Sequence, residues 1–512
     1  MSQRPQRVDW YCVSAIVGAA VILLVTLLLP LGFDNDVYQS MAWALYAYHG
    51  LPYLASWDMN FPGIVFIHWA SIALFGSSDF GFRLFDYLVQ IVFAAMYFRL
   101  LRRWLSPFES LVAVVVYAVG YVHGAWGIEG QRDAFAVFFL VASALVLFRM
   151  RERVPGGWSA VTLGVLSSAA ILIRPTYGLF AIVLAALVWS LNTRWQHVLS
   201  YLFGHVMLWT FFLVPYALTD GGISQFYHST ISFNLDIYSR IRVGNGVFSM
   251  SNLVYWILAL LGLVLPARCP TRYEKRNIER FDRKFMVLFA MCAIISPMVM
   301  GKYFTYHLLA AQTILIPLAC VGLLKTLDYV PWRNARHVAI AASLVVPLGL
   351  LYPRHLIRYY ASGLHSGEPL HYTYAKVLSD SLFGLAAQEE AVRYLDARIG
   401  GSAKVEYVTL FPALSWRLGH PTATRFTTIV PLARASEAPP LYVKVWQKEF
   451  IDSIQSAKPS YVILSRSHEW WPFVHAYADS VAHQIPGFDE MLATRYQLDT
   501  VIRGFELYRL RP

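Results

Sequence analysis

The sequence is poor in charge. Only 14% of its 512 residues are Asp, Glu, Lys or Arg, whereas a soluble globular chain carries roughly 25%. Hydrophobic residues make up 57%, and the mean hydropathy is +0.47. Several apolar stretches reach the ~20 residues that are needed to cross the hydrocarbon core of a bilayer. This composition excludes an ordinary soluble globular chain and predicts a polytopic α-helical membrane protein.

Cysteine is scarce as well. The four cysteines show no metal-binding spacing such as C-x2-C, and they imply no disulfide framework. The net charge of +11 comes from basic residues that are spread over many short loops, which makes a nucleic-acid-binding patch a poor explanation. The positive-inside bias of membrane proteins explains this charge better. Basic residues precede a first apolar run that lacks a small-residue cleavage site, so we expect an uncleaved first span.

The charge asymmetry between loops predicts about eleven spans, with the N-terminus inside and the C-terminus outside. The first span, about 12–30, delivers the stretch "GFDNDVY" to the outer side. The apolar run 61–76 is short, and we expect it to lie on the outer face as an interfacial or re-entrant helix. The next span, 82–101, then brings the basic stretch "FRLLRRW" to the inner side. The later loops alternate in charge, and the last span falls at about 337–352.

The composition changes at about residue 353, where Pro, Gly and charged residues return. Residues 386–400 have helical periodicity, "KVEYVTL" and "SYVILSR" indicate buried strands, and "GFELYRL" indicates a terminal strand. We therefore predict two domains. A transmembrane domain covers 1–352, and a soluble extracytoplasmic α/β domain covers 353–512. The sequence shows no convincing internal repeat and no low-complexity linker.

Ionisable side chains gather on the predicted outer side, where the positive-inside bias does not account for basic ones. Asp34 and Asp36 follow the first span, and Asp58 lies farther along the same loop. The other candidates in chain order are Glu129, Arg132, Asp133, Arg174, Arg240, Arg242, Lys302 and His307. Arg and Lys pair with phosphate oxygens, and a carboxylate can take a proton from a hydroxyl. The set predicts a site that binds a phosphorylated substrate and deprotonates a second one.

A structural role stays open for each of these residues. The acids are typical of turns and helix N-caps, and Arg174, at the end of a span, could snorkel. Arg240 and Arg242 lie in a long outer segment, about 219–246, which we interpret as a loop suited to cover a substrate.

Five stretches, by their order and sidedness, resemble the GT-C glycosyltransferase fold. "DND" at 34–36 resembles its acidic motif, and "HGLPYLASWDMNFPG" resembles the continuation of the first outer loop, where a Pro-Gly pair opens a helix along the membrane. "FGSSDFGFRLFDYL" resembles the next stretch, and "GKYFTYHLLA" a late outer loop. The tail from "AKVEYVTL" to "GFELYRL" resembles the periplasmic C-terminal domain of bacterial members. The resemblance covers nearly the whole chain and is nearest to the dolichyl-phosphate-mannose protein mannosyltransferase-like and lipid A aminoarabinose transferase-like group.

The resemblance implies a bacterial inner-membrane enzyme whose active site and C-terminal domain face the periplasm. Its donor would be a sugar on a polyprenyl phosphate of the undecaprenyl-phosphate type, and its acceptor a hydroxyl of a glycan, a lipid or a protein. One Asp of the first loop would be the general base, and transfer would invert the sugar. Asp34 is slightly favoured as the base. Asp36 stays an alternative, because Asn35 stands where many relatives have Glu.

No organic cofactor is implied, and a divalent cation stays open. Some GT-C enzymes bind such a cation near the acidic motif, and Asp34, Asp36, Glu129 and His307 could supply its ligands.

Two other classes of protein compete with an enzyme. A transporter or lipid flippase places charged groups near the bilayer midplane, often within inverted repeats, whereas here the charged groups cluster at one face. A non-catalytic envelope scaffold would leave the outer acids and bases without a role.

Overall fold

The chain divides into two compact units. Unit 1 comprises Met1–Leu27, Phe85–Trp209 and Val243–Arg354, and unit 2 comprises Leu28–Leu84, Thr210–Arg242 and His355–Pro512. The computed structural model describes residues 9–28, 31, 33–123, 129–152, 156–192, 195–240, 280–301, 305–327, 385–400, 403–409, 413–420, 422–432, 439–465 and 482–512. The predicted domain boundary at 352/353 lies outside these residues and stays a prediction.

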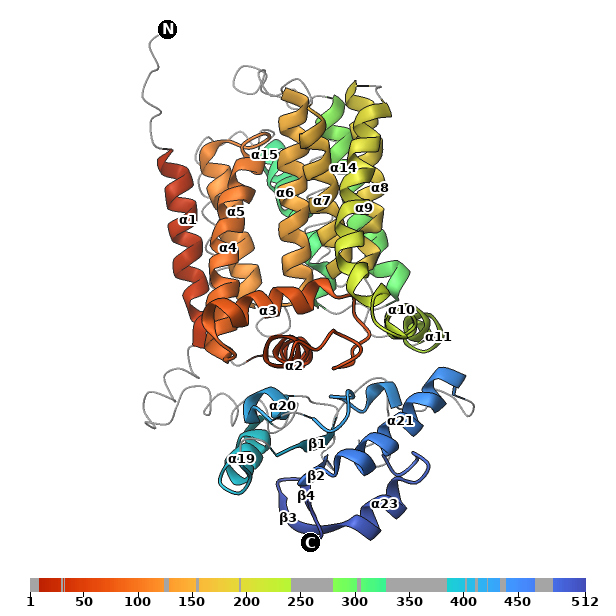
Figure 1. Cartoon of the computed structure of the whole chain (residues 1–512). Coiled ribbons are helices and arrows are strands. Elements are labelled where there is room, and N and C mark those ends of the chain that lie inside the picture. The colour runs from red at the N-terminus through yellow and green to blue at the C-terminus, as the bar shows by residue number, and fades with distance from the viewer. Residues whose placement is uncertain are drawn as a thin grey trace, which may run out of the picture. The chain divides into compact units, whose positions relative to one another are not determined.

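Unit 1 is a helical bundle. Figure 1 shows its helices as roughly parallel rods. In chain order they are α1 (Trp10–Leu23), most of α4 (Asp79–Leu101), α5 (Pro107–His123), α6 (Arg132–Glu152), α7 (Gly157–Ile173), α8 (Gly178–Asn192), most of α9 (Trp195–Ala217), α14 (Arg280–Met300) and α15 (Leu309–Leu327). These helices are apolar and are joined by short polar segments, which is the pattern that the sequence predicts for membrane helices.

Several of these helices can cross a bilayer. In the part of the chain that the structure describes, five are long and apolar enough, namely Trp10–Leu27, α4, α6, α9 and α14. The chain is a multi-pass helical membrane protein. The helix α3 (Gly63–Phe75) has 13 residues, fewer than the ~20 of a full span. The count of eleven spans stays a prediction, because the last expected span, 337–352, lies outside the described residues.

Helices α7 and α9 approach each other closely. A methyl group on Gly164 of α7 would lie 2.0 Å from the carbonyl oxygen of Tyr201, and one on Gly204 of α9 would lie 2.3 Å from the carbonyl oxygen of Val161. Ser167 also donates a hydrogen bond to the Tyr201 hydroxyl at 3.0 Å. Small residues that let two backbones meet are a common interface between membrane helices.

Unit 2 joins three segments that are far apart in sequence. The first segment, 28–84, carries α2 (Phe33–Tyr48) and α3, and the second, 210–242, carries α10 (Gly222–Tyr227), the π-helical turn η4 (His228–Ser232), α11 (Phe233–Asp236) and η5 (Tyr238–Arg240). The expected loop over 219–246 is therefore wrong for 222–240, which forms short helices. The C-terminal segment, 355–512, carries α19 (Leu385–Asp396), α20 (Ala413–Leu418), α21 (Leu441–Ala457) and α23 (Phe488–Arg495). The helix α19 confirms the predicted helix.

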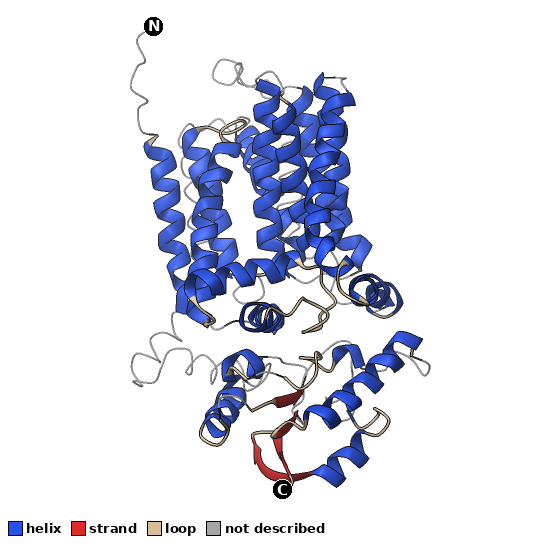
Figure 2. Ribbon diagram, in the orientation of Figure 1, coloured by secondary structure: helices blue, strands red, loops and turns tan. Residues whose placement is uncertain are grey.

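A four-stranded sheet lies in the C-terminal segment, and Figure 2 shows its strands in red. The strands β1 (Val405–Val408), β2 (Tyr461–Ser465), β3 (Tyr496–Ile502) and β4 (Phe505–Leu510) have the order β1-β2-β4-β3. The pair β1–β2 is parallel, and the other two pairs are antiparallel. The three predicted strands are confirmed as β1, β2 and β4. The hairpin partner β3 was missed, because most of its side chains are not buried and its apolar alternation is weak.

One aromatic core connects the three segments of unit 2. Trp57 of the first segment packs edge-on against Phe233 of the second, with ring centroids 5.0 Å apart. The same Trp57 packs edge-on against Trp446 of α21 at 5.7 Å. Since all three side chains are at most 2% exposed, the first and second segments fold onto the C-terminal segment through buried apolar area.

Glu406 of β1 is a fully buried acid. Its carboxyl accepts hydrogen bonds from the backbone N–H and the hydroxyl of Thr424, at 2.9 and 2.8 Å. Burial nevertheless raises the pKa of Glu406 to about 8, since desolvation disfavours the charged form more than these two bonds favour it.

Candidate functional site

Three charged residues of unit 1 meet in the bundle, two from the first turn of α6 and one from the residue that follows α7. Asp133, in the first turn of α6, is fully buried; its Oδ1 lies 3.4 Å from Nε of Arg174, and its Oδ2 lies 3.8 Å from Nε of Arg132. The Tyr177 hydroxyl donates to Oδ1 of Asp133 at 3.3 Å. We call Arg132, Asp133, Arg174 and Tyr177 the charge cluster. It places two guanidinium groups beside one carboxylate in an apolar bundle, and the desolvation cost of this arrangement marks it as a candidate functional site.

The local sequence explains how Arg174 reaches this position. Pro175 disfavours helical geometry at the residue before it, and Arg174 adopts an extended conformation with φ −137° and ψ 97°. Helix α7 therefore ends at Ile173, and a 3-10 turn, η3 (Pro175–Tyr177), opens α8. The turn brings Tyr177 onto the same carboxylate as Arg174.

Arg174 has a hydrogen-bond donor that its described neighbours do not use. Its side chain is almost wholly buried, and Nη2 lies 2.7 Å from the sulfur of Met300, at the end of α14. Its Nη1 atom is buried and has no hydrogen-bond partner among the residues that the structure describes. A thioether is a weak acceptor, so this guanidinium could bind an anionic oxygen more strongly than it binds its present neighbours.

Glu129 and His307 lie close to the charge cluster. Glu129 is buried in the turn before α6, and His307 is buried in the 3-10 turn η7 (Thr305–Leu308). The turn η7 contacts α6 and α14, while η3 contacts α7 and α14. Unit 1 thus brings the predicted residues Glu129, Arg132, Asp133, Arg174 and His307 to one end of its bundle. Tyr177 and Met300 were missed, since neither carries a charge that sequence reasoning could single out.

A second buried polar network supports the turn before α6. The Tyr121 hydroxyl donates to both carboxylate oxygens of Asp86, each at 2.9 Å, and accepts from the backbone N–H of Gly130 at 2.7 Å. Asp86 also accepts from Gln90, at 3.3 Å. Sequence analysis did not select Asp86, although an acid inside a predicted span was the available signal.

The acidic pair lies in a helix and not in a loop. Asp34 and Asp36 belong to the first turn of α2, in unit 2, and their side chains lie outside the described part of the structure. The helical position has a physical reason, because negative charge is favourable near a helix N-terminus.

Asp58 sits in a buried turn of unit 2. Its carboxylate is 5% exposed and accepts from the backbone N–H of Asn60 at 3.2 Å and from the Asn60 side chain at 3.0 Å. Asn234 of the second segment donates to the carbonyl oxygen of Met59 at 2.7 Å. These contacts fit the turn role that sequence analysis left open, and they also fix the carboxylate in place.

The remaining predicted residues are described in part or not at all. Arg240 ends η5, and its side chain lies outside the described part. Arg242 and Lys302 lie outside the described residues. Within the described side chains, no group of three or more His, Cys, Asp or Glu is placed to hold a metal ion. The cation hypothesis stays open, because two of its four proposed ligands are Asp34 and Asp36.

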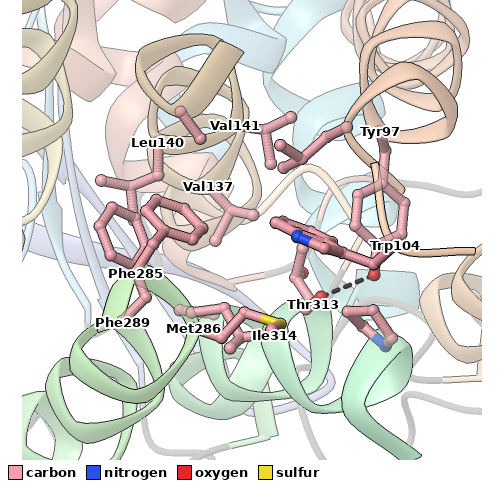
Figure 3. A pocket seen from close by; sticks show the side chains of 14 residues that line it. Tyr97, Trp104, Val137, Leu140, Val141, Phe285, Met286, Phe289, Thr313 and Ile314 are labelled. Carbon is pink, nitrogen blue, oxygen red and sulfur yellow. Dashed lines mark hydrogen bonds between the residues drawn. The ribbon is translucent and has the colours of Figure 1, made fainter. Parts of the chain in front are cut away.

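An apolar cavity lies farther inside unit 1, between α4, α6, α14 and α15. Its volume is about 40 Å³, and its walls include Leu140, Phe285 and Ile314. Figure 3 shows these side chains together with Tyr97, whose hydroxyl donates to the carbonyl oxygen of Thr313 at 2.6 Å. The cavity suits a hydrocarbon group and offers little to a polar one.

Comparison with known proteins identifies the fold. Residues 56–217 match the model of the dolichyl-phosphate-mannose-protein mannosyltransferase family. The crystal structure of ArnT from Cupriavidus metallidurans bound to undecaprenyl phosphate matches with a TM-score of 0.58 and 13% identity, over 98% of this chain and 97% of ArnT. Part of the chain therefore resembles this family, and the chain as a whole has the GT-C fold. The apo structure of ArnT matches over the same shares, with a TM-score of 0.57 and 13% identity. No curated protein matches the sequence.

The GT-C resemblance expected from the sequence is confirmed. At 13% identity the structural match establishes the fold alone, so the chemistry of this chain has to be argued from its own residues. The region that matches the family model contains Asp58, Glu129, Arg132, Asp133 and Arg174. Asp34 and Asp36 precede that region.

Proposed function

We propose that this protein is an integral-membrane glycosyltransferase. It moves a sugar from a polyprenyl-phosphate donor, of the undecaprenyl-phosphate type, to an acceptor hydroxyl at the periplasmic face of a bacterial inner membrane. The observation that carries the proposal is the buried charge cluster, where Arg174 has an unused donor. The fold also supports the proposal, because the structure of ArnT, which has a similar fold, contains undecaprenyl phosphate.

The phosphate of the donor lipid is proposed to bind at Arg174. Arg132 adds positive charge on the other side of Asp133, and His307 lies on the neighbouring turn. A guanidinium in an apolar, water-poor site stabilises negative charge more strongly than it does in water. Asp133 and Tyr177 keep the Arg174 side chain oriented before the lipid arrives.

The proposed reaction uses these groups together with the acidic pair that was expected from the sequence. A carboxylate of the first segment, Asp34 in the favoured assignment and Asp36 in the alternative, takes the proton of the acceptor hydroxyl. The oxygen attacks the anomeric carbon, the bond from this carbon to the phosphate oxygen breaks, and the polyprenyl phosphate leaves with the bonding electrons. Arg174 stabilises the charge on the leaving phosphate, and attack from the opposite side inverts the sugar.

The test is sugar release by purified protein from a panel of polyprenyl-phosphate sugars in the presence of candidate acceptors. Asp34→Asn and Asp36→Asn are compared with wild type. Asp220→Asn serves as the matched control, because Asp220 is an exposed acid in the turn after α9. Loss of a general base lowers turnover by about 10²- to 10⁴-fold. We expect this loss in one of the two variants, with binding of the lipid phosphate retained.

Other outcomes point to the competing classes. Binding of lipid phosphate without sugar release from any donor, together with movement of the lipid across vesicles, would favour a flippase. Absence of both binding and turnover would favour a scaffold. A divalent cation is a separate hypothesis, and turnover after chelation followed by metal addition tests it.

A further inference from the structure

Arg417, in the short helix α20 of the C-terminal segment, reaches two other elements of unit 2. Its side chain is only 10% exposed; Nη2 lies 3.0 Å from Oδ1 of Asp79 and Nη1 lies 2.7 Å from Oε1 of Glu389. The guanidinium also covers the ring of Trp416 at 4.7 Å. Asp79 is the first residue of α4, so this ion pair joins residues 338 positions apart.

Asp79 has a second contact that leads to the acidic pair. The same Oδ1 atom accepts the backbone N–H of Leu31 at 2.7 Å. Leu31 lies three residues before Asp34. A further bond joins the two helices, since the hydroxyls of Ser40 in α2 and Ser415 in α20 are 2.8 Å apart. The C-terminal segment therefore holds the middle of α2 directly, through Ser40, and the chain that leads into α2 through Asp79.

Arg425 makes an equivalent connection to the Asp58 turn. It forms a two-pronged pair with Glu449, at 2.6 and 2.9 Å, and its Nη1 donates to the carbonyl oxygen of Tyr53 at 2.6 Å. The backbone N–H of Trp57 donates to the carbonyl oxygen of Arg425 at 2.7 Å. Tyr53 has φ of 69°, a conformation that a non-glycine residue keeps only where its surroundings impose it. Arg425 is one of those surroundings.

We propose that Arg417 and Arg425 are positioning residues for the acids of the first segment. Arg417 fixes the chain that leads into Asp34 and Asp36, and Arg425 fixes the turn that carries Asp58. The C-terminal segment is thus part of the reaction's architecture, although neither arginine touches a substrate. This inference rests on the proposed glycosyl transfer, where a small displacement of a catalytic group lowers the rate strongly.

The experiment compares full-length wild type with Arg417→Gln, Arg417→Lys and Asp79→Asn. Arg398→Gln is the control, because Arg398 is an exposed arginine of the same segment that stacks on Tyr394. Two quantities are measured: amide hydrogen exchange at the start of α2, and the kcat and KM for sugar release. Loss of a charge-assisted bond should speed exchange there by about tenfold or more. We expect kcat to fall by about ten- to a hundredfold while the KM for the donor changes little.

Three further comparisons separate positioning from general stability. The double variant Arg417→Gln/Asp79→Asn should be no slower than the worse single variant, because both residues act through one connection. Arg417→Lys should recover part of the rate, since a single ammonium can keep one of the two ion pairs. Arg425→Lys, tested in the same way, should change exchange at 53–60 and leave the start of α2 unaffected.

Unchanged exchange at α2 in Arg417→Gln overturns the proposal, whatever the activity. Faster exchange with an unchanged kcat overturns it too, because the acids would then need no such support. If wild type releases no sugar from any donor, the proposed function fails, and the exchange measurement alone decides whether Arg417 anchors α2.

Discussion

Replacing Arg174 by lysine tests the phosphate site without removing its charge. The lysine ammonium can stay near Asp133, so this buried carboxylate keeps two cationic neighbours. It cannot, however, replace three separate nitrogen atoms. Nε faces Asp133, Nη2 faces Met300, and Nη1 is buried without a hydrogen-bond partner in the described part of the structure. A charge-assisted hydrogen bond contributes about 1.5–3 kcal/mol, and about 1.4 kcal/mol corresponds to a factor of ten, so we expect kcat/KM for the donor to fall about 10- to 100-fold.

The assay measures kcat/KM for sugar release and, separately, inhibition by the free polyprenyl phosphate. Both should weaken together in Arg174→Lys, because the donor and the released lipid share the phosphate. Arg149→Lys is the matched control, since Arg149 is exposed and lies in the last turn of α6, far from the charge cluster. The melting temperature is recorded for every variant, so that a misfolded protein is recognised.

Inhibition by polyprenyl phosphate decides the result. If Arg174→Lys keeps the wild-type inhibition constant and loses only kcat, Arg174 does not bind the ground-state phosphate, and the reasoning from its unused Nη1 atom is wrong. If both parameters stay at wild-type values, the charge cluster is structural.

Three more predictions concern stability. Tyr121→Phe should destabilise the protein by about 1.5–3 kcal/mol, because it removes a donor to a buried carboxylate. Tyr117→Phe loses one bond to a neutral amide and should destabilise it by about 1 kcal/mol. Thermal unfolding in detergent compares the two variants. Gly204→Ala should lower the melting temperature, because its new methyl group would meet backbone atoms, while Gly120→Ala should not, since nothing lies within 4 Å of its methyl position. Glu406 binds a proton more tightly in the folded state, with a pKa of about 8 against 4.5, so stability should fall as the pH rises from about 5 to about 8, by an upper limit of about 5 kcal/mol. Glu406→Gln should flatten this slope, and a melting temperature that is independent of pH in wild type would contradict the argument.

Sequence reasoning found the parts of the site that carry charge. Arg132, Asp133 and Arg174 were selected because ionisable groups are costly in a membrane helix, and the structure brings all three together. Tyr177 could not be selected in this way, because a tyrosine at a helix end is common and its hydroxyl partner depends on how α6 and α8 pack. Asp86 did offer a signal, as an acid inside a predicted span, but its partner Tyr121 depends on how α4 and α5 pack.

In the fold, too, local sequence patterns predicted single elements but not the packing between segments that are far apart in the chain. The strands β1 and β2 were predicted because both are short apolar runs that end in turn signals, and these runs are fully buried. Nothing in the local pattern indicated that 28–84 and 210–242 would fold with the C-terminal segment. That arrangement depends on Trp57, Phe233 and Trp446, which come together only in three dimensions.

The two ends of helix α6 differ in a way that supports the proposed location of the reaction. The helix has 21 residues, so its ends are about 30 Å apart. At its far end Arg103 pairs with Glu152 at 2.5 Å, and Arg151 pairs with Asp282; these side chains are 10–57% exposed. At its near end Asp133 and Arg174 are almost wholly buried, and one nitrogen lacks a partner in the described structure. Ion pairs that only anchor a helix end can stay in contact with water, so the buried and incompletely paired end is the one that fits the proposed binding of an anionic ligand. A transporter would instead be expected to carry such a group near the middle of a span, whereas Asp133 is the second residue of α6 and Arg174 follows the last residue of α7.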